Sequence, residues 1–214
     1  MITATDEQYH LSDITIEQVY PELTSYQINK LYDYSKYLQE WNNKINLISR
    51  KNIDHVVDQH IIPCLSITRM LSVPKNSNIL DIGTGGGLPG IPLAICYPYV
   101  KFRLIDSIGK KIMAVNDMID RLGLSNVIAE NVRAETIDKK FDIIVARAVT
   151  NLSNFLSYAS PLLKSNGRIV YIRGMDCHEE LQHLRHYNVY SLEKLTGIAK
   201  YNDKIILEIF QQHQ

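Results

Sequence analysis

The residues best suited to chemistry lie in one glycine-rich stretch, residues 81–90, with the sequence DIGTGGGLPG. Such a turn between a strand and a helix lets a ligand approach the backbone closely, because glycine has no Cβ to obstruct it. A turn that serves packing alone does not need so many glycines. Asp106 follows roughly twenty residues later, where an acid can accept hydrogen bonds from the two ribose hydroxyls of a nucleoside. The pattern therefore predicts a ligand that contains a nucleoside.

Two classes of nucleoside cofactor fit this stretch. Gly85, Gly87 and Gly90 satisfy the G-x-G-x-x-G fingerprint of dinucleotide-binding proteins, which is weak evidence by itself. Counted from its first aspartate, the same stretch has the D-x-G-x-G-x-G spacing of Rossmann-like methyltransferases. Pro89 and Pro92 favour the second interpretation, since proline offers no N–H to a pyrophosphate at the opening of a helix. Little chain also remains for the substrate domain of a nicotinamide enzyme, so S-adenosylmethionine is the expected cofactor.

Alternating sequence patterns indicate the elements that position this loop. From residue 78 onward, short apolar stretches alternate with helical ones, which predicts a parallel, doubly wound sheet. The stretch 141–146 is almost entirely apolar, as expected of a strand buried on both faces. We expect five such strands at 78–82, 101–105, 126–129, 141–146 and 168–172. Two final strands, near 187–192 and 204–210, are expected to pair as an antiparallel edge hairpin.

The first third of the chain has a helical pattern instead. Thr24 and Ser25 are candidate N-caps, and apolar residues then recur at three- and four-residue spacing through Trp41. A second helix is expected after Ser49, and Pro63 is expected to kink or end it. We expect residues 1–76 to form a helical extension packed on a Rossmann-like domain of residues 77–214, as one compact unit.

Bulk composition is that of an ordinary globular protein, with 214 residues of which 45% are hydrophobic and 21% charged. The apolar runs are too short to span a bilayer, and the N-terminus lacks the features of a signal peptide. The 3 cysteines have no C-x-x-C pair, so neither a disulfide framework nor a metal site is expected. Basic and acidic residues balance at 23 each, so any nucleic acid must be bound by local basic patches. These features predict a cytoplasmic protein, and nothing in them requires a partner chain, so we expect a monomer.

Several short segments also occur in a characteristic order. They are WNNKINL from residue 41, His60, the glycine-rich stretch, LIDSIGKK from residue 104, RAE from residue 133 and ARA from residue 146. Together they resemble the glucose-inhibited division protein B family, the guanine-N7 methyltransferases of small-subunit (16S) ribosomal RNA. The resemblance runs from about residue 31 to residue 174. It implies the class I fold of S-adenosylmethionine-dependent methyltransferases, with a mostly parallel seven-stranded sheet.

The resemblance also implies the site residues. Together with the glycine and ribose arguments, it predicts a cofactor site formed by Gly83, Gly85, Gly87, Leu88, Asp106, Ala134, Glu135 and Arg147. RNA contacts are expected from His60, Lys110, Lys111, Arg147 and Arg173, with Lys44, Arg50, Lys51 and Arg133 as further basic candidates. Two departures from the family pattern stand out. Ile62-Pro63-Cys64 occurs where the family has Leu-Asp-Ser after its helical histidine, and Arg173-Gly174 replaces the usual Lys-Gly.

The expected reaction explains why no general base is evident. Guanine N7 carries an in-plane lone pair at neutral pH and can attack a sulfonium methyl group without first losing a proton. The enzyme then needs alignment more than acid–base catalysis, and no catalytic residue is predicted. Residues 146–150 also lack the Asp/Asn-Pro-Pro-aromatic signature of exocyclic-amine methylation. Two alternatives stay open: a methyltransferase of another substrate, and a nucleotide- or RNA-binding protein without catalysis.

Overall fold

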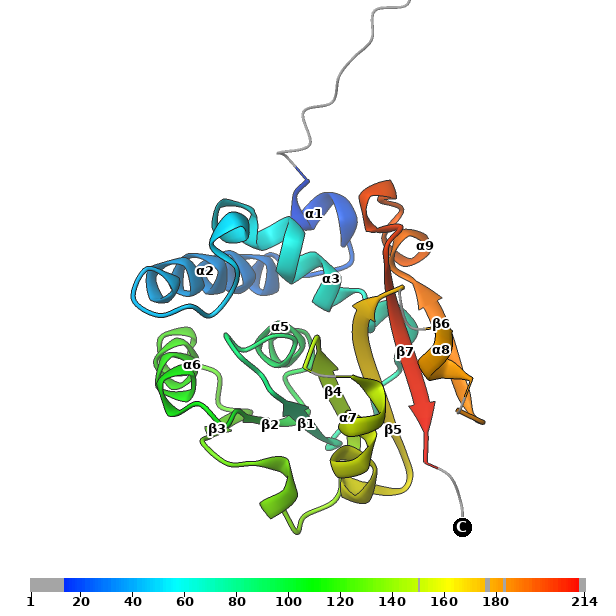
Figure 1. Cartoon of the computed structure of the whole chain (residues 1–214). Helices are drawn as coiled ribbons and strands as arrows, with labels where there is room; N and C mark the ends of the chain where they lie inside the picture. The colour runs from blue at the N-terminus through cyan, green and yellow to red at the C-terminus, as the bar shows by residue number, and fades with distance from the viewer. Residues whose placement is uncertain (1–13, 150, 176–177, 183, 212–214) are drawn as a thin grey trace, which may run out of the picture.

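A seven-stranded sheet forms the centre of the protein (Figure 1). The computed structural model describes residues 14–149, 151–175, 178–182 and 184–211. The strand order is β3-β2-β1-β4-β5-β7-β6, and β7 is antiparallel to both of its neighbours while the other pairings are parallel. The strands are β1 (Asn78–Ile82), β2 (Lys101–Ile105), β3 (Val127–Glu130), β4 (Phe141–Arg147), β5 (Leu163–Gly174), β6 (Tyr187–Ser191) and β7 (Lys204–Phe210).

The expected parallel sheet is confirmed, with a difference at its antiparallel side. The two final strands do pair, but β7 lies between β5 and β6, so that only β6 is at the edge. They are also separated by α9 (Leu192–Thr196) and the 3-10 turn η5 (Ala199–Tyr201) instead of a tight hairpin turn. The physical reason is apolar content, because β7 has five consecutive buried residues whereas β6 has none.

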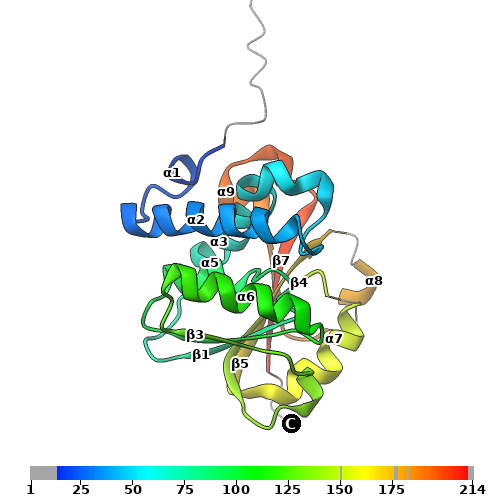
Figure 2. The ribbon, with the colours of Figure 1, turned by 90° about the vertical axis from the view of Figure 1, so that its left-hand side faces the viewer.

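Helices cover the two faces of the sheet unequally (Figures 1 and 2). One face packs against α5 (Gly90–Cys96), α6 (Gly109–Leu122) and the N-terminal helices. The other face packs against α7 (Leu152–Ala159), the 3-10 turn η4 (Ser160–Leu162) and α8 (His178–Leu181). Between β3 and β4 the chain forms only a short 3-10 turn, η3 (Ala134–Thr136). None of the helices in the described ranges has the length and apolar character needed to cross a bilayer.

The N-terminal segment is helical, as expected. After α1 (Ile16–Val19), the helix α2 (Ser25–Asn42) begins with a capping box in which Thr24 and Gln27 satisfy each other's backbone amides. The second expected helix is divided into the 3-10 turn η1 (Arg50–His55), the π-helical turn η2 (Val57–Ile61), α3 (Ile62–Leu65) and α4 (Ile67–Met70). The helical path continues past Pro63, so it does not end there, which was one of the two expected outcomes, and the change from the π-helical η2 to the α-helical α3 falls directly before Pro63. Pro63 lies in the first turn of α3, where its missing N–H is tolerated.

Candidate active site

The glycine loop after β1 is held by a buried carboxylate. Asp81 Oδ2 accepts hydrogen bonds from Thr84 Oγ1 at 2.6 Å and from the Gly90 amide at 2.9 Å. Burial raises the pKa of Asp81 to about 7, although these two donors oppose the shift. Gly87 has a φ of +97°, and a Cβ on it would lie 2.5 Å from Ile91 Cδ1. Asp81 therefore shapes the turn from beneath and does not face a ligand.

Helix α2 holds the same loop from its other side. The buried Tyr34 hydroxyl donates a hydrogen bond to the Gly86 carbonyl at 2.9 Å. A Cβ on Gly86 would lie only 2.7 Å from Leu38 Cδ1, so α2 packs directly on the loop backbone. The N-terminal segment therefore takes part in the shape of the loop.

The first turn of α5 uses its own amides internally. The donor–acceptor pairs are Gly90 N to Asp81 Oδ2 at 2.9 Å, Ile91 N to Gly87 O at 2.7 Å and Leu93 N to Pro89 O at 3.2 Å. Pro92 has no N–H to offer. A dinucleotide pyrophosphate is bound by free amides at such a helix start. Because this start has none, the geometry argues against a dinucleotide and favours a nucleoside without phosphate.

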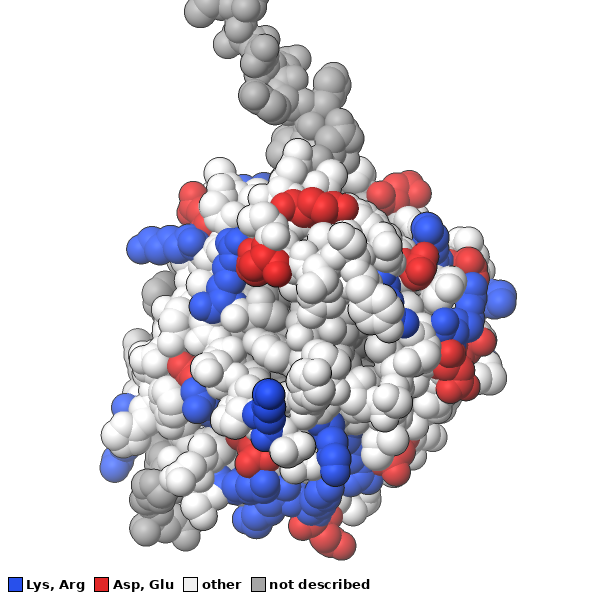
Figure 3. All heavy atoms as spheres, turned by 180° about the vertical axis from the view of Figure 1, so that it is seen from behind, with Lys and Arg blue, Asp and Glu red and all other residues white. Residues whose placement is uncertain are grey.

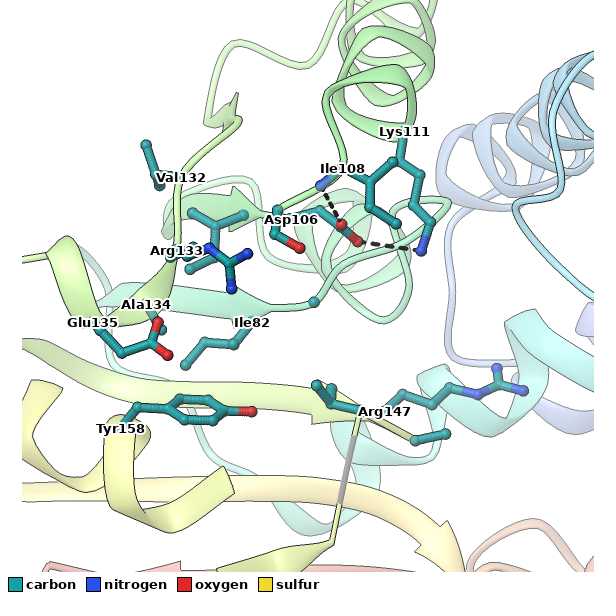
Figure 4. A pocket seen from close by; sticks show the side chains of 15 residues that line it. Ile82, Asp106, Ile108, Lys111, Val132, Arg133, Ala134, Glu135, Arg147 and Tyr158 are labelled. Atoms are coloured by element: carbon teal, nitrogen blue, oxygen red, sulfur yellow. Dashed lines mark hydrogen bonds and ion pairs between the residues drawn. The ribbon is translucent and has the colours of Figure 1, made fainter. Parts of the chain in front are cut away.

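Asp106 lies at the end of β2 and has its carboxylate in the site (Figure 4). Its oxygens accept hydrogen bonds from the Gly85 amide at 3.1 Å and the Ile108 amide at 2.9 Å. Lys111 Nζ lies 3.6 Å from the same carboxylate. The Gly85 amide thus helps to orient the Asp106 carboxylate. Lys111, which we expected to contact RNA, lies beside that carboxylate instead.

A cavity of about 370 Å³ opens at the carboxyl ends of β1, β2 and β4. This is the edge at which open α/β sheets bind ligands. Of the expected cofactor residues, the structure brings Gly83, Asp106, Ala134, Glu135 and Arg147 to its wall. Gly85, Gly87 and Leu88 are not part of the wall and lie in the loop behind it.

Apolar and aromatic side chains complete the wall, and sequence reasoning missed them. They are Ile82, Ile105, Ile108, Val132, Val149 and Tyr158. Figure 4 shows the Tyr158 ring across the cavity from Asp106. The ring is held edge-on against Phe155, with 5.6 Å between ring centroids and 87° between planes. Tyr158 lies on α7, and no local pattern indicates which face of that helix meets the cavity.

Arg147 contributes to the cavity wall, but its guanidinium points away from Asp106 and Glu135 (Figure 4). Its Nη atoms donate to the carbonyls of Gln59 at 3.1 Å and His60 at 3.2 Å, and Nη2 lies 2.7 Å from His60 Nδ1. A guanidinium has no acceptor, so Nδ1 of His60 accepts and the ring proton lies on Nε2. Burial and the adjacent Arg147 charge lower the pKa of His60 to about 3, which keeps the ring neutral.

The remaining expected RNA contacts differ in their surroundings. Lys110 and Arg133 are exposed, and Arg133 also reaches the cavity wall. The Arg173 guanidinium binds both carboxylate oxygens of Glu180 at 2.9 Å, and its side chain is only 12% exposed. Lys44 Nζ stands 4.7 Å from the centre of the Trp41 ring. The side chains of Arg50 and Lys51 lie outside the described part of the chain.

Sequence comparison decides the family. The family described as GidB, rRNA small subunit methyltransferase G, matches residues 27–206. The chain belongs to this family. The family's relative from Flavobacterium johnsoniae is 41% identical over 186 residues, which cover 84% of this chain and 89% of the relative. Another, from Porphyromonas gingivalis, is 42% identical over 171 residues, covering 78% of this chain and 77% of the relative. Both are named ribosomal RNA small subunit methyltransferase G.

Solved structures agree with the fold of this methyltransferase family. A SAM-dependent methyltransferase from Aquifex aeolicus superposes with a TM-score of 0.58 at 15% identity, covering 77% of this chain and 100% of that one. A ribosomal protein L11 methylase from Lactobacillus delbrueckii gives 0.55 at 17% identity, covering 71% and 77%. The expected family, the methyltransferase class and the class I fold are all confirmed.

Proposed function

We propose that this protein transfers the methyl group of S-adenosylmethionine to N7 of a guanine in the 16S RNA of the small ribosomal subunit. The observation that carries the proposal is the cavity at the sheet's carboxyl edge, in which Asp106 presents a carboxylate while the start of α5 keeps no amide for a pyrophosphate. Membership of the family supports the choice of methyl acceptor. Such an enzyme would act in the cytoplasm, as a monomer, on the subunit or on its RNA.

The residues of the cavity fit the proposed cofactor. The Asp106 carboxylate can accept the two ribose hydroxyls, and the apolar side chains of Ile108 and Val149 can flank a flat adenine ring. A Cβ on Gly83 would lie 3.1 Å from Val149 Cγ2, so this glycine keeps the wall open. Glu135 adds negative charge on the same wall, which suits a cationic sulfonium ligand. When bound, S-adenosylmethionine supplies an electrophilic methyl group.

Methyl transfer to guanine N7 requires mainly that the protein align the two reacting groups. The N7 lone pair needs no general base, so the chain's task is to hold the guanine in line with the methyl group and to exclude water. Two residues illustrate this. Tyr158 closes the wall opposite Asp106, and Arg147 joins the end of β4 to the N-terminal helices.

The cofactor contact is tested with Asp106→Asn. Asparagine keeps one acceptor oxygen but removes the charge, and a hydrogen bond to a charged group contributes about 1.5–3 kcal/mol. We expect roughly 10- to 100-fold weaker binding of S-adenosylhomocysteine by calorimetry, with a matching loss of methyl transfer at low cofactor concentration. The exposed Asp138→Asn is the matched control and is expected to change neither.

The identity of the methyl acceptor is tested with the native chain in a methyl-transfer assay. Transfer of labelled methyl groups is measured on protein-free 16S RNA and on small subunits, followed by nuclease digestion and identification of the modified nucleoside. Recovery of 7-methylguanosine supports the proposal. Label in another nucleoside, or binding of the cofactor without transfer to either substrate, would contradict it.

A further inference from the structure

The edge of the sheet opposite the cavity carries many basic side chains. Parallel strands present their amino ends together, and Lys101 begins β2, Lys139 and Lys140 precede β4, and Lys164 is the second residue of β5. We call this region the amino-edge patch and define it as Lys75, Lys101, Arg103, Lys139, Lys140, Lys164 and Arg168. Figure 3 shows basic side chains gathered along the lower part of the molecule seen from behind.

Part of this charge is not neutralised by the protein. Arg103 pairs with Glu130, Lys164 with Asp142 at 2.8 Å, and Arg168 with Glu208 at 2.9 Å. In contrast, Lys101, Lys139 and Lys140 are exposed, and none of them forms an ion pair with an acid in the described ranges. The whole chain has a formal net charge of zero, so these lysines are a local excess.

The patch is also hollowed. A groove of about 460 Å³ is lined by the basic residues Lys101, Arg103 and Lys139 and by apolar residues that include Ile128. The groove is open because the connection from β3 to β4 contains only the short turn η3. A crossover helix in this connection would cover the face of the sheet. Ile128 is consequently 57% exposed. A second hollow of about 300 Å³ is lined by Lys75, Lys164 and Arg168.

A basic rim around an apolar floor matches the chemistry of a single-stranded or irregular nucleic acid. Lysine ammonium groups can follow the phosphates, and apolar or aromatic surface can meet the bases. Tyr99, which is 69% exposed with Lys75 Nζ 5.3 Å from its ring centre, provides such a surface beside the patch. An acidic protein surface would also be attracted to the lysines, but it has no flat bases to pack against the apolar surface between the charges.

We propose that the amino-edge patch binds the phosphate backbone of the RNA substrate as a second contact region, separate from the cavity. The identity of the RNA rests on the proposed function. The five residues of β1 span about 17 Å, so the patch and the cavity are too far apart for one nucleotide to reach both. A folded ribosomal RNA can reach both edges at once, and the patch then adds affinity without taking part in methyl transfer.

The test is the double variant Lys101→Gln/Lys139→Gln. Each phosphate contact contributes about 0.7–0.9 to the slope of log affinity against log salt concentration. For protein-free 16S RNA we expect the slope of the variant to be shallower by about 1.4–1.8, because two contacts are lost. Binding of S-adenosylhomocysteine is expected to be unchanged. Lys36→Gln/Lys194→Gln removes the same charge from exposed positions outside the patch and is expected to keep the native slope.

The outcomes separate this inference from the proposed function. If the patch variant keeps the native salt slope while the native chain methylates the RNA, RNA binding by the amino-edge patch is contradicted and the proposed function is not. A defect seen with small subunits but not with protein-free RNA would also overturn it, since the partner would then be a protein surface. Absence of methyl transfer by the native chain would contradict the proposed function. Asp106→Asn is expected to keep the native salt slope while transferring less methyl at low cofactor concentration, a result that would show that the two sites act independently.

Discussion

At the scale of single residues, burial sets the properties of the acids and bases around the glycine loop. Asp81 is fully buried. Its Oδ2 can accept its two hydrogen bonds whether the carboxyl group is ionised or carries its proton on the other oxygen, Oδ1, which has no partner. His60 is buried too, and its pKa moves in the opposite sense to that of Asp81. Both shifts favour the neutral form, as desolvation requires. These residues organise the site without lining its cavity.

The shift at Asp81 predicts a pH dependence of stability. The unfolded chain releases this proton near pH 3.9, whereas the folded protein holds it up to about pH 7. The folded state therefore binds more protons between these values, and its stability falls as pH rises, by at most about 1.4 kcal/mol per pH unit. Asp81→Asn keeps an acceptor for Thr84 and Gly90 but cannot ionise. Urea unfolding from pH 4 to pH 7 should show the variant gaining stability relative to the native chain.

The comparison between the two proteins removes the contributions of other groups. The lowered pKa of His60 has the opposite effect, because it makes the folded protein less stable as pH falls below 6.5. This effect is the same in the variant and in the native chain. A difference in free energy of unfolding that stays constant across this range would show that Asp81 titrates normally.

At the scale of elements, one arginine joins strand β4 to the π-helical turn η2. In a regular helix the residue at position 63 would donate its N–H to the Gln59 carbonyl four residues earlier, but Pro63 has none. Arg147 Nη2 donates to that carbonyl instead. Arg147 thus supplies a donor to a carbonyl that Pro63 cannot serve. It ties the end of a cavity-lining strand to the N-terminal helices.

Replacement of Arg147 by lysine tests this connection. A lysine keeps the charge but cannot bridge the two carbonyls and the His60 ring at once. Leaving a buried acceptor unsatisfied costs about 1–3 kcal/mol, and we expect Arg147→Lys to reduce the free energy of unfolding in urea by that amount. Arg185→Lys, at an exposed position, is expected to change it by less than about 0.5 kcal/mol. Equal effects of the two substitutions would remove the proposed connection.

At the scale of the whole molecule, the N-terminal helices and the sheet share one core. Leu31, Leu38 and Ile61 are buried in the same cluster as Ile91 and Leu104. Trp41 Nε1 donates to Asp117 of α6 at 2.7 Å, and Tyr34 bonds to the glycine loop. A core of this kind loses part of its apolar cover if either segment is removed. The cavity depends on the loop, and the loop depends on α2.

We therefore predict that residues 77–214 alone do not form the cofactor site. Removing residues 1–76 exposes the apolar face that α2 to α4 cover, and it also removes the Tyr34 hydrogen bond. We expect loss of cooperative thermal unfolding and no measurable binding of S-adenosylhomocysteine. Addition of a peptide of residues 14–76 is expected to restore part of the binding. A fragment that binds with native affinity by itself would show that the extension is dispensable for the site.

Local patterns determined much of this protein from its sequence. Strands β1, β2 and β7 have the expected bounds, and the glycine spacing and Asp106 pointed to the edge of the sheet where the cavity lies. Both could be predicted because strand period and turn chemistry depend on neighbouring residues. Tertiary structure alone decided that β7 enters the sheet interior, that Tyr158 and Lys111 reach the cavity, and that the Arg147 guanidinium turns away from it. Each of these depends on which distant surfaces pack together, since side-chain direction follows the partners available in the folded core and not the local pattern.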